Sequence, residues 1–342
     1  MTTTADVRPP ATESSMEDAY LEYRKACSLI VLKHAEERGL MECLATPRTV
    51  DEIVSDQGYL PQRAPILELL LGALERLGAV RRTDGEKPGY ERNSALTADD
   101  VAIDTDLVAR AIGVEQVGPL LHGQNYGGIV DTLRQPTNPI GADFSAANIA
   151  VWEEFLQQPF YRYARQHAVR SISKPGGNVL DLACGPGFGL LELAEEVGED
   201  GTVVGVEISR DFVCEALKRT EELGNVRVAQ GDLDEGIGFL SDDYFSGAML
   251  IGAYHFLKRP EVLFSEAVRV LEPEGRLAVG YVYSKRGSPD QEIMDLRFAL
   301  REPPSTPPHP EDIERLATEQ GLTKVDELTM GCFTSFVFQR AA

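Results

Sequence analysis

Three glycines at alternate positions follow a short apolar run, and this stretch carries the clearest chemical signal in the chain. The run Val179–Ala183 contains one carboxylate, Asp181, and leads into Gly185, Gly187 and Gly189. Glycine lets a turn adopt left-handed backbone angles and lets a ligand approach the main chain closely. The pattern predicts a buried parallel strand, a tight turn against a ligand and a following helix.

A second carboxylate, Glu207, ends the next apolar run, Thr202–Glu207. In a doubly wound sheet, a carboxylate at this place binds the two hydroxyls of a ribose. The ligand is therefore expected to contain a nucleoside. The two candidate ligands are a dinucleotide and S-adenosylmethionine. A dinucleotide fingerprint reads Gly-x-Gly-x-x-Gly, whereas the glycines here read Gly-x-Gly-x-Gly. The spacing favours S-adenosylmethionine.

The glycine pattern, together with the preceding Asp181, resembles motif I of the class I S-adenosylmethionine-dependent methyltransferases. The resemblance implies that the glycine loop passes the methionine part of the cofactor. It also implies that the cofactor product is S-adenosylhomocysteine. It also implies that Asp232 accepts a hydrogen bond from the adenine amino group and that Leu233 packs on the ring; the alternative for Asp232 is an ordinary turn aspartate. The cofactor-binding residues expected on this basis are Asp181, Gly185, Gly187, Glu207, Ile208, Asp232 and Leu233.

His255 is the candidate catalytic residue. Counted back from Pro260, it stands where the small-molecule O-methyltransferases carry the general base of their Leu-His-Asp-Trp motif. An imidazole, with an ordinary pKa of about 6.5, can take the proton of a hydroxyl at neutral pH. Phe256 and Leu257 replace the Asp and Trp of that motif. The alternative for His255 is therefore a role in packing or substrate contact.

A catalytic base is usually oriented by a carboxylate, and Glu302, Glu311 and Asp312 are the candidates for that role. The segment Ser288–Pro310 is expected to form a lid over the acceptor, because it combines apolar residues with stiffening Pro-Pro pairs. The residues expected to contact the acceptor are Trp152, Tyr161, Tyr163, Tyr254, Met294 and Phe298. Residues 151–172 are expected to form a helix, and for most of its aromatic residues the alternative is a place in the core.

The composition limits the classes of partner and compartment. The 342 residues include 55 acidic and 33 basic side chains, a formal net charge of −22, which opposes the phosphate neutralisation that nucleic-acid binding needs. No apolar run approaches the roughly 18 to 20 residues of a membrane span, and residues 1–15 are expected to be a disordered tail without a signal core. The five cysteines and five histidines lack metal-ligand spacing. We expect a cytoplasmic protein without a nucleic-acid, membrane or metal partner.

The N-terminal half is predicted to form helices followed by a hairpin. Residues 16–39 have helical periodicity, Thr49 and Glu52 form a capping box, a further helix starts near Pro61, and a hairpin turn includes Gly85. This order is typical of a winged helix, but its third helix has no net positive charge, which argues against DNA binding. The order resembles the N-terminal dimerisation domain of the small-molecule O-methyltransferases and implies a homodimer.

Strands alternate with helices through the C-terminal half, which predicts a parallel sheet covered on both faces. The expected strands are 179–183, 202–207, 226–230, 247–251, 276–282, 323–328 and 333–338. The last two are too close for a crossover helix and should pair as an antiparallel hairpin. The predicted fold class is α/β, a Rossmann-like seven-stranded doubly wound sheet with its last strand antiparallel, preceded by the mainly α winged-helix domain. The expected divisions are a tail 1–15, a helical dimerisation domain 16–140 and a methyltransferase domain 141–342.

These features together predict a homodimeric enzyme that transfers a methyl group from S-adenosylmethionine to a small-molecule acceptor. The expected acceptor group is a hydroxyl of a bacterial secondary metabolite, deprotonated by His255. Carbon or nitrogen methylation is an alternative, because the residues after His255 depart from the O-methyltransferase motif. A further alternative is an enzyme that binds the cofactor but catalyses a rearrangement or cyclisation. The acceptor itself is not predicted by the sequence.

Overall fold

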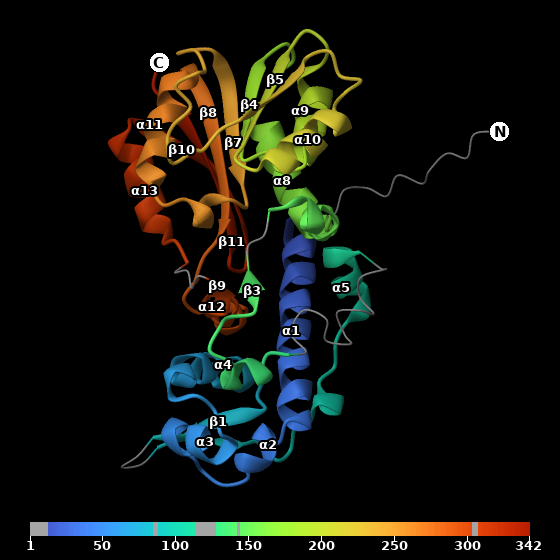
Figure 1. Cartoon of the computed structure of the whole chain (residues 1–342), viewed down its shortest axis with the longest axis vertical. Coiled ribbons are helices and arrows are strands. Elements are labelled where there is room, and N and C mark those ends of the chain that lie inside the picture. Colours follow the sequence, from blue (N-terminus) through green and yellow to red (C-terminus); the bar gives the residue numbers. More distant parts are fainter. Residues whose placement is uncertain (1–12, 85–87, 114–127, 142–143, 303–306) are drawn as a thin grey trace, which may run out of the picture.

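The computed structural model describes residues 13–84, 88–113, 128–141, 144–302 and 307–342. A helix-flanked sheet forms the upper part of Figure 1 and a mainly helical region forms the lower part, with the long helix α1 (Glu13–Glu37) reaching from one to the other. Residues 13–15 of the expected tail are helical, and the rest of that tail lies outside the described residues. Within the described ranges, no helix is both long enough and apolar enough to cross a bilayer.

The N-terminal half follows the predicted order of helices and hairpin. Its elements after α1 are α2 (Leu40–Cys43), α3 (Val50–Gln57), α4 (Ala64–Arg76), β1 (Val80–Thr83), β2 (Gly89–Arg92) and α5 (Thr105–Ile112), with 3-10 turns at Pro61–Arg63, Ala98–Asp100 and Asp131–Arg134. The capping box is confirmed: the Thr49 hydroxyl accepts from the Glu52 N–H at 3.3 Å, and the Glu52 carboxylate accepts from the Thr49 N–H at 2.9 Å. This reciprocal pair satisfies two N–H groups that have no partner within the helix.

The single helix expected across 151–172 is in fact two helices. α7 (Ile149–Leu156) ends before Gln157, and α8 (Pro159–Ile172) begins at Pro159. Proline cannot donate the hydrogen bond of a continuing helix, and it pushes the preceding residue into an extended conformation. Gln158 accordingly has ψ 135°. The break separates α8, which packs on the sheet, from α7, which carries Trp152 to the edge where the strands end.

The C-terminal half forms the predicted seven-stranded sheet. In spatial order, its strands are β10 (Leu322–Met330), β11 (Phe333–Arg340), β8 (Leu271–Val282), β7 (Phe245–Ile251), β4 (Asn178–Leu182), β5 (Thr202–Glu207) and β6 (Val226–Gln230). β11 runs antiparallel to both of its neighbours, while the five strands from β8 to β6 pair in parallel. The Rossmann-like sheet with its last strand antiparallel is therefore confirmed.

Helices cover both faces of this sheet. α9 (Phe188–Val197) and α10 (Arg210–Arg219) lie with α8 on one face, and α11 (Pro260–Val270) and α13 (Pro310–Glu319) lie on the other (Figure 1). Successive residues of β4 alternate between the two cores: Val179 packs with residues of α8 and α9, whereas Leu180 packs with residues of α11. Such a strand is buried on both faces, which explains its continuous apolar run.

Helix α12 (Gln291–Ala299) corrects the expectation of a lid. It is buried in the same core as α1 and α4, with Met294 and Phe298 exposing 2% and 1% of their surface. Arg76 of α4 makes a bidentate pair with Glu292 of α12, with N–O distances of 2.9 and 2.8 Å. After α12, β9 (Arg301–Glu302) pairs in parallel with β3 (Ile140–Gly141). α12 thus belongs to the helical part in space, although it lies between two strands of the large sheet in sequence.

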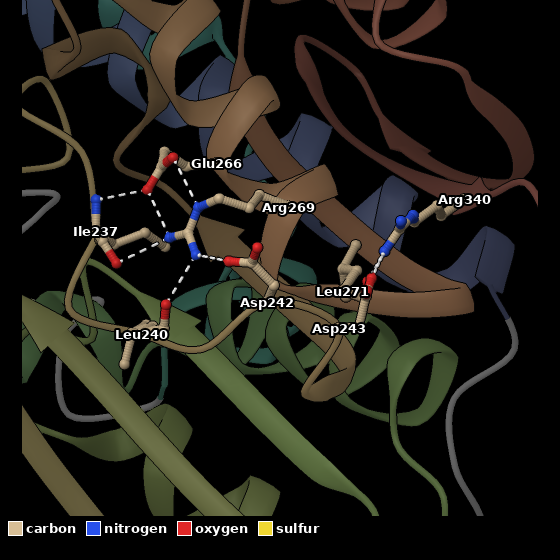
Figure 2. A network of polar contacts seen from close by, with 8 residues as sticks. All are labelled: Ile237, Leu240, Asp242, Asp243, Glu266, Arg269, Leu271 and Arg340. Atoms are coloured by element: carbon tan, nitrogen blue, oxygen red, sulfur yellow. Dashed lines mark hydrogen bonds and ion pairs between the residues drawn. The ribbon is translucent and has the colours of Figure 1, made fainter.

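A polar network fastens the loop that joins β6 to β7 (Figure 2). Arg269 of α11 pairs with Glu266 at 3.0 and 2.8 Å and donates to the carbonyls of Ile237 and Leu240 at 3.0 and 2.8 Å. It also reaches Asp242 at 2.6 Å, while Arg340 bonds Asp243 and the Leu271 carbonyl. A single guanidinium can satisfy this many acceptors because its donors form a rigid planar fork. The network anchors the far end of the loop that begins with the candidate residues Asp232 and Leu233.

Candidate cofactor and acceptor site

The carboxyl ends of β4, β5, β6 and β7 meet at one edge of the sheet and surround a cavity. Its empty volume is about 820 Å³, including the part that is open to solvent. Most of the predicted cofactor residues line it, namely Gly185, Glu207, Ile208, Asp232 and Leu233. Ligands of open parallel sheets bind at this edge. The topology therefore brings together residues that are up to 48 positions apart in the sequence, from Gly185 to Leu233.

The glycine turn has the predicted geometry, and its third glycine is required for a different reason. Gly185 and Gly187 have φ of 55° and 94°, and Gly187 is the left-handed residue that precedes α9. A Cβ on Gly189 would lie 2.2 Å from Oδ2 of Asp181 and 2.6 Å from the terminal carbon of Met249. Of the predicted cofactor residues, Asp181 and Gly187 do not line the cavity, and Gly189 does not line it either. Gly189 thus serves the close packing of α9 on the buried carboxylate of β4.

Glu207 is held in place by the backbone of two neighbouring loops. It is only 6% exposed, and its two carboxylate oxygens accept from the Gly185 N–H at 2.9 Å and the Ser209 N–H at 2.8 Å. Burial raises the pKa of this carboxyl, and the backbone donors oppose the rise. Each oxygen has further lone pairs for a ligand hydroxyl. The arrangement fits the predicted role at a ribose.

Asp232 and Asp234 tie together the loops that follow β6 and β7. Asp232 accepts from the Asp234 N–H at 2.9 Å, and Asp234 accepts from the N–H groups of Lys258 and Arg259 at 3.0 and 2.8 Å. Asp232 is thus a turn residue and a cavity residue at once, so the two interpretations of it are compatible. Leu233 is 9% exposed beside it. Asp234 was not predicted, because a turn aspartate has no distinctive sequence signal.

Aromatic side chains from four separate segments form one rim of the cavity. The Phe144 ring stacks on Trp152 at 5.1 Å and meets Phe212 and Phe256 edge-on at 6.0 and 5.2 Å. All four line the cavity. Of these, only Trp152 was predicted, as an acceptor contact. Nothing in the local sequence around the other three marks them, since it is the fold that brings the segments together.

Tyr161 joins the end of β7 to α8, as its predicted place beside the pocket requires. Its hydroxyl donates to the Ile251 carbonyl at 2.8 Å, and its ring lines the cavity. A Cβ on Gly252 would lie 1.7 Å from the tyrosine oxygen, so a side chain at that position would displace Tyr161. Tyr163 is half-buried against the core of the helical part and does not line the cavity.

Two other predicted acceptor contacts lie in the hydrophobic cores. Tyr254 packs against Phe264 and Tyr281 on the α11 face of the sheet, with ring centroids 6.5 and 5.7 Å apart. Met294 faces the core of the helical part. Neither residue lines the cavity, because apolar side chains near a strand end or at helical spacing serve packing as readily as they serve ligand contact. Phe298 is also buried in that core, but its ring lies 6.0 Å from that of His255.

His255 lies behind the aromatic rim and has an unexpected setting. Its ring centroid is 4.0 Å from that of Phe256, which does line the cavity. Neither ring nitrogen has a hydrogen-bond partner among the described residues. Burial lowers the pKa of His255 well below its usual value, and the charges of Arg301 and Arg297 lower it further. The imidazole is therefore neutral at physiological pH.

The expected carboxylate partner of His255 is not observed in the described part of the chain. Glu302 instead accepts from the Asn138 N–H at 3.0 Å and so fastens β3 to β9. Glu311 and Asp312 lie in the first turn of α13, and none of the three bonds the imidazole. The charged groups that act on His255 are instead two arginines, Arg301 and Arg297, and both lower its pKa. The segment after α12 is close to His255, as predicted, but the charge that it contributes is positive.

Asp181 has a buried carboxyl that makes stability depend on pH. It is 4% exposed, and burial raises its pKa to about 8, although Arg165 pulls it down. Between about pH 4 and about pH 8, the folded protein keeps a proton that the unfolded chain has released. Stability must therefore fall as pH rises through that window, by at most about 1.4 kcal/mol per pH unit.

Asp181→Asn removes this titration while keeping the shape of the side chain. We expect the variant to lose less unfolding free energy than the wild type when pH rises from about 5 to about 8, and to match it most closely at the acidic end. Urea unfolding of the ligand-free protein at both pH values measures the difference. Asp200→Asn, at an exposed turn, is the matched control and should follow the wild type. Parallel losses in the wild type and in Asp181→Asn would refute the assignment.

Comparisons with known proteins agree with this geometry. Residues 173–321, a little under half of the chain, match the family model described as a methyltransferase domain. Nocamycin O-methyltransferase of Saccharothrix syringae is 37% identical over 109 residues, which cover 31% of this chain and 38% of that protein. The ubiquinone/menaquinone biosynthesis C-methyltransferase UbiE of Geobacter sulfurreducens is 33% identical over 120 residues, which cover 34% of this chain and 46% of that protein. The chain thus spans less than half the length of either relative.

A solved structure extends the likeness of fold to the helical part. The crystal structure of the CurJ carbon methyltransferase matches this structure with a TM-score of 0.61 at 13% identity, over 95% of this chain and 92% of that chain. The family match assigns residues 173–321 to a methyltransferase domain, and the strand order of the whole sheet is that of the class I S-adenosylmethionine-dependent methyltransferases. The cofactor of this domain is S-adenosylmethionine.

The residues present fit this cofactor. The cavity combines a buried carboxylate at the end of β5, a second carboxylate at the end of β6, and apolar and aromatic walls of the kind that an adenine ring needs. A Cβ on Gly185 would meet its nearest neighbour, a Leu156 methyl carbon, only at 3.8 Å, so the main chain there is open to close approach. When bound, S-adenosylmethionine supplies a methyl group activated by the adjacent sulfonium.

Proposed function

We propose that this chain is a methyltransferase that acts on a hydroxyl of a small-molecule acceptor, with His255 as the base. One observation carries the proposal: a neutral imidazole without a hydrogen-bond partner among the described residues packs on Phe256, and Phe256 lines the cofactor cavity. Buried polar atoms are normally paired, so the free nitrogens of His255 suggest a partner that arrives with the ligand. The proton of an acceptor hydroxyl would be such a partner.

In this proposal, the chain's own residues divide the work of binding. Glu207 accepts from the ribose hydroxyls, Asp232 accepts from the adenine amino group, and Leu233 packs on the ring. His255 takes the acceptor proton, a contribution worth about 10²- to 10⁴-fold in rate where a base is needed. Its low pKa keeps the imidazole unprotonated but also makes it a weak base. It therefore suits an acceptor whose hydroxyl is already fairly acidic.

A second candidate function is methylation of carbon or nitrogen. The positive surroundings of His255 favour it, because arginines stabilise an acceptor that is already ionised, such as an enolate, and such an acceptor needs little help from a base. The two curated relatives include an O-methyltransferase and a C-methyltransferase by name, and both match only over the cofactor domain. These two matches therefore do not identify the atom of the acceptor that is methylated. A cofactor-binding enzyme that catalyses a rearrangement or cyclisation is the third candidate.

We propose that the partner of the N-terminal helical part is a second copy of the chain. We infer that α2, α3, α4 and the β1–β2 hairpin form the winged-helix unit predicted from the sequence, and that this unit makes a homodimer. The order of these elements supports the inference. Its surface arginines on the hairpin pair with acidic neighbours, Arg81 with Glu91 at 2.7 Å and Arg82 with Glu75 at 2.9 Å. They are thus already neutralised by the protein itself, which argues against a role at DNA phosphates.

The proposed function is tested by product analysis. The protein is incubated with S-adenosylmethionine and a panel of small phenols, enols and hydroxy acids, and the products are analysed by mass spectrometry. The expected product is heavier than its acceptor by one methylene unit and forms in step with S-adenosylhomocysteine. Fragmentation then identifies the methylated atom as oxygen, carbon or nitrogen. Conversion of an acceptor without a change in mass would overturn methyl transfer and favour the third candidate.

A further inference from the structure

Arg301 lies beside His255 and is fixed by the backbone around it. It follows α12 and forms β9 with Glu302, paired to β3. Its carbonyl accepts from the Asn138 side-chain amide at 2.6 Å, and Arg63 in turn bonds the Asn138 oxygen. These contacts use the main chain of Arg301 and leave its guanidinium free to point elsewhere. The arginine is thus held by groups that do not neutralise it.

The guanidinium lies between two aromatic rings. Its central carbon is 4.3 Å from the ring centroid of Phe298 and 5.7 Å from that of Phe256. Among the described residues, Nη1 is buried without a hydrogen-bond partner, and no carboxylate is within ion-pair distance of Arg301. Burial, followed by the neighbouring charge of Arg297, lowers its pKa to about 10. The aromatic faces attract the cation but cannot satisfy its N–H donors.

A partly buried cation that finds no counter-charge among the described residues is a costly arrangement. Arginine cannot readily shed its proton, and buried charges in proteins are normally paired and hydrogen-bonded. Here a second group that lacks a partner in the described part of the chain, His255, lies against the same two rings. The fold therefore places a fixed positive charge and an imidazole against the same two rings, one of which, Phe256, lines the cofactor cavity. An oxyanion would supply a counter-charge to Arg301 and a hydrogen-bond partner to His255.

We propose that Arg301 binds an anionic oxygen of the acceptor, so that the acceptor of this enzyme is an acid. The proposal rests on the proposed function, because it concerns the acceptor of the same site. A planar guanidinium recognises a carboxylate by two parallel hydrogen bonds, or an ionised phenol or enol by one. In the first case the anion anchors the acceptor, and in the second it is the reactive group itself. The shared chemistry is a negatively charged oxygen between Arg301 and His255.

Matched pairs of small probes test this proposal without knowledge of the true acceptor. The protein is saturated with S-adenosylhomocysteine, and binding is measured by calorimetry at constant ionic strength. Acetate is compared with acetamide, benzoate with benzamide, and 4-nitrophenolate with 4-nitroanisole. We expect the wild type to bind an anion in preference to its neutral partner, and Arg301→Met to lose about 10- to 100-fold in anion affinity, as expected for one charge-assisted hydrogen-bonded contact.

Two controls make the result specific. Arg286→Met removes the same charge from an exposed position and should leave anion binding unchanged, while Arg301→Lys should restore part of it. Preference for the carboxylates identifies an anchoring group, and preference for the phenolate identifies the reactive oxygen; either supports the proposal. Equal affinity of wild type and Arg301→Met for every anion overturns it. If S-adenosylhomocysteine itself fails to bind the wild type, the proposed function fails instead.

Discussion

Replacing Glu207 with alanine is expected to weaken the binding of S-adenosylhomocysteine about 100-fold or more. Two ribose hydroxyls would lose their charged acceptor, and each such hydrogen bond contributes about 1.5 to 3 kcal/mol. The Gly185 N–H and the Ser209 N–H would lose theirs as well, at 2.9 and 2.8 Å, so the glycine loop would also be held less firmly. Isothermal titration calorimetry measures the change in affinity.

The control for Glu207→Ala separates ribose recognition from support of the loop. An analogue of S-adenosylhomocysteine that lacks the 2′-hydroxyl should bind the wild type more weakly than the parent compound does. Glu207→Ala should bind the two compounds almost equally, because the group that distinguishes them is gone. Glu207→Gln keeps the shape and one acceptor oxygen, and an intermediate affinity is expected. If Glu207→Ala kept the wild-type preference for the 2′-hydroxyl, the ribose assignment would fail.

Replacing His255 with alanine is expected to reduce kcat about 10²- to 10⁴-fold for a hydroxyl acceptor, with cofactor affinity unchanged. The reason for the second part is geometric, because His255 lies behind Phe256 and does not line the cofactor cavity. For a carbon acceptor that is ionised before it binds, the loss should be less than about tenfold, since no proton has to be taken in the transition state. Steady-state kinetics on the acceptor found by product analysis distinguishes the two cases.

A matched variant and a rescue experiment guard against a trivial loss of packing. His309→Ala changes an exposed histidine at the start of α13 and should keep full activity. Added imidazole should recover part of the activity of His255→Ala if the lost function is proton transfer. Wild-type kcat in His255→Ala on a hydroxyl acceptor would contradict its role as the base.

The elements of the fold could be predicted where their signals are local. The capping box of α3 depends on two residues three positions apart, and the strands of the sheet depend on short apolar runs. The break at Pro159 was missed, although proline is itself a local signal. The position of α12 was missed for a different reason. Its apolar residues fit an acceptor lid and a buried helix equally well, and only contact with α4 decides between them.

The residues of the candidate site, too, could be predicted only where their signals are local. Gly185, Glu207, Asp232 and Leu233 could be predicted because a parallel sheet gathers its strand ends at one edge, so position within a strand implies position in the site. Phe144 and Arg301 could not, since both lie outside the large sheet, where position depends on the whole fold. The charge around His255 was predicted with the wrong sign. A sequence shows which charged residues follow a given strand, but it does not show which of their side chains point toward the ring of His255.

Because α12 is buried in the helical core, the C-terminal half of this protein cannot be combined with another N-terminal region without changing the contacts of α12. The residues proposed to bind the cofactor all come from the large sheet and its loops, whereas Phe298 and Arg301 are positioned through α4, Arg63 and Asn138. If Arg301 and His255 bind the acceptor as proposed, exchange of the N-terminal region with that of a relative would leave the cofactor cavity intact but change the surroundings of the acceptor. On that proposal, the choice of acceptor could change, in evolution or by engineering, through substitutions in the helical part, outside the cofactor cavity.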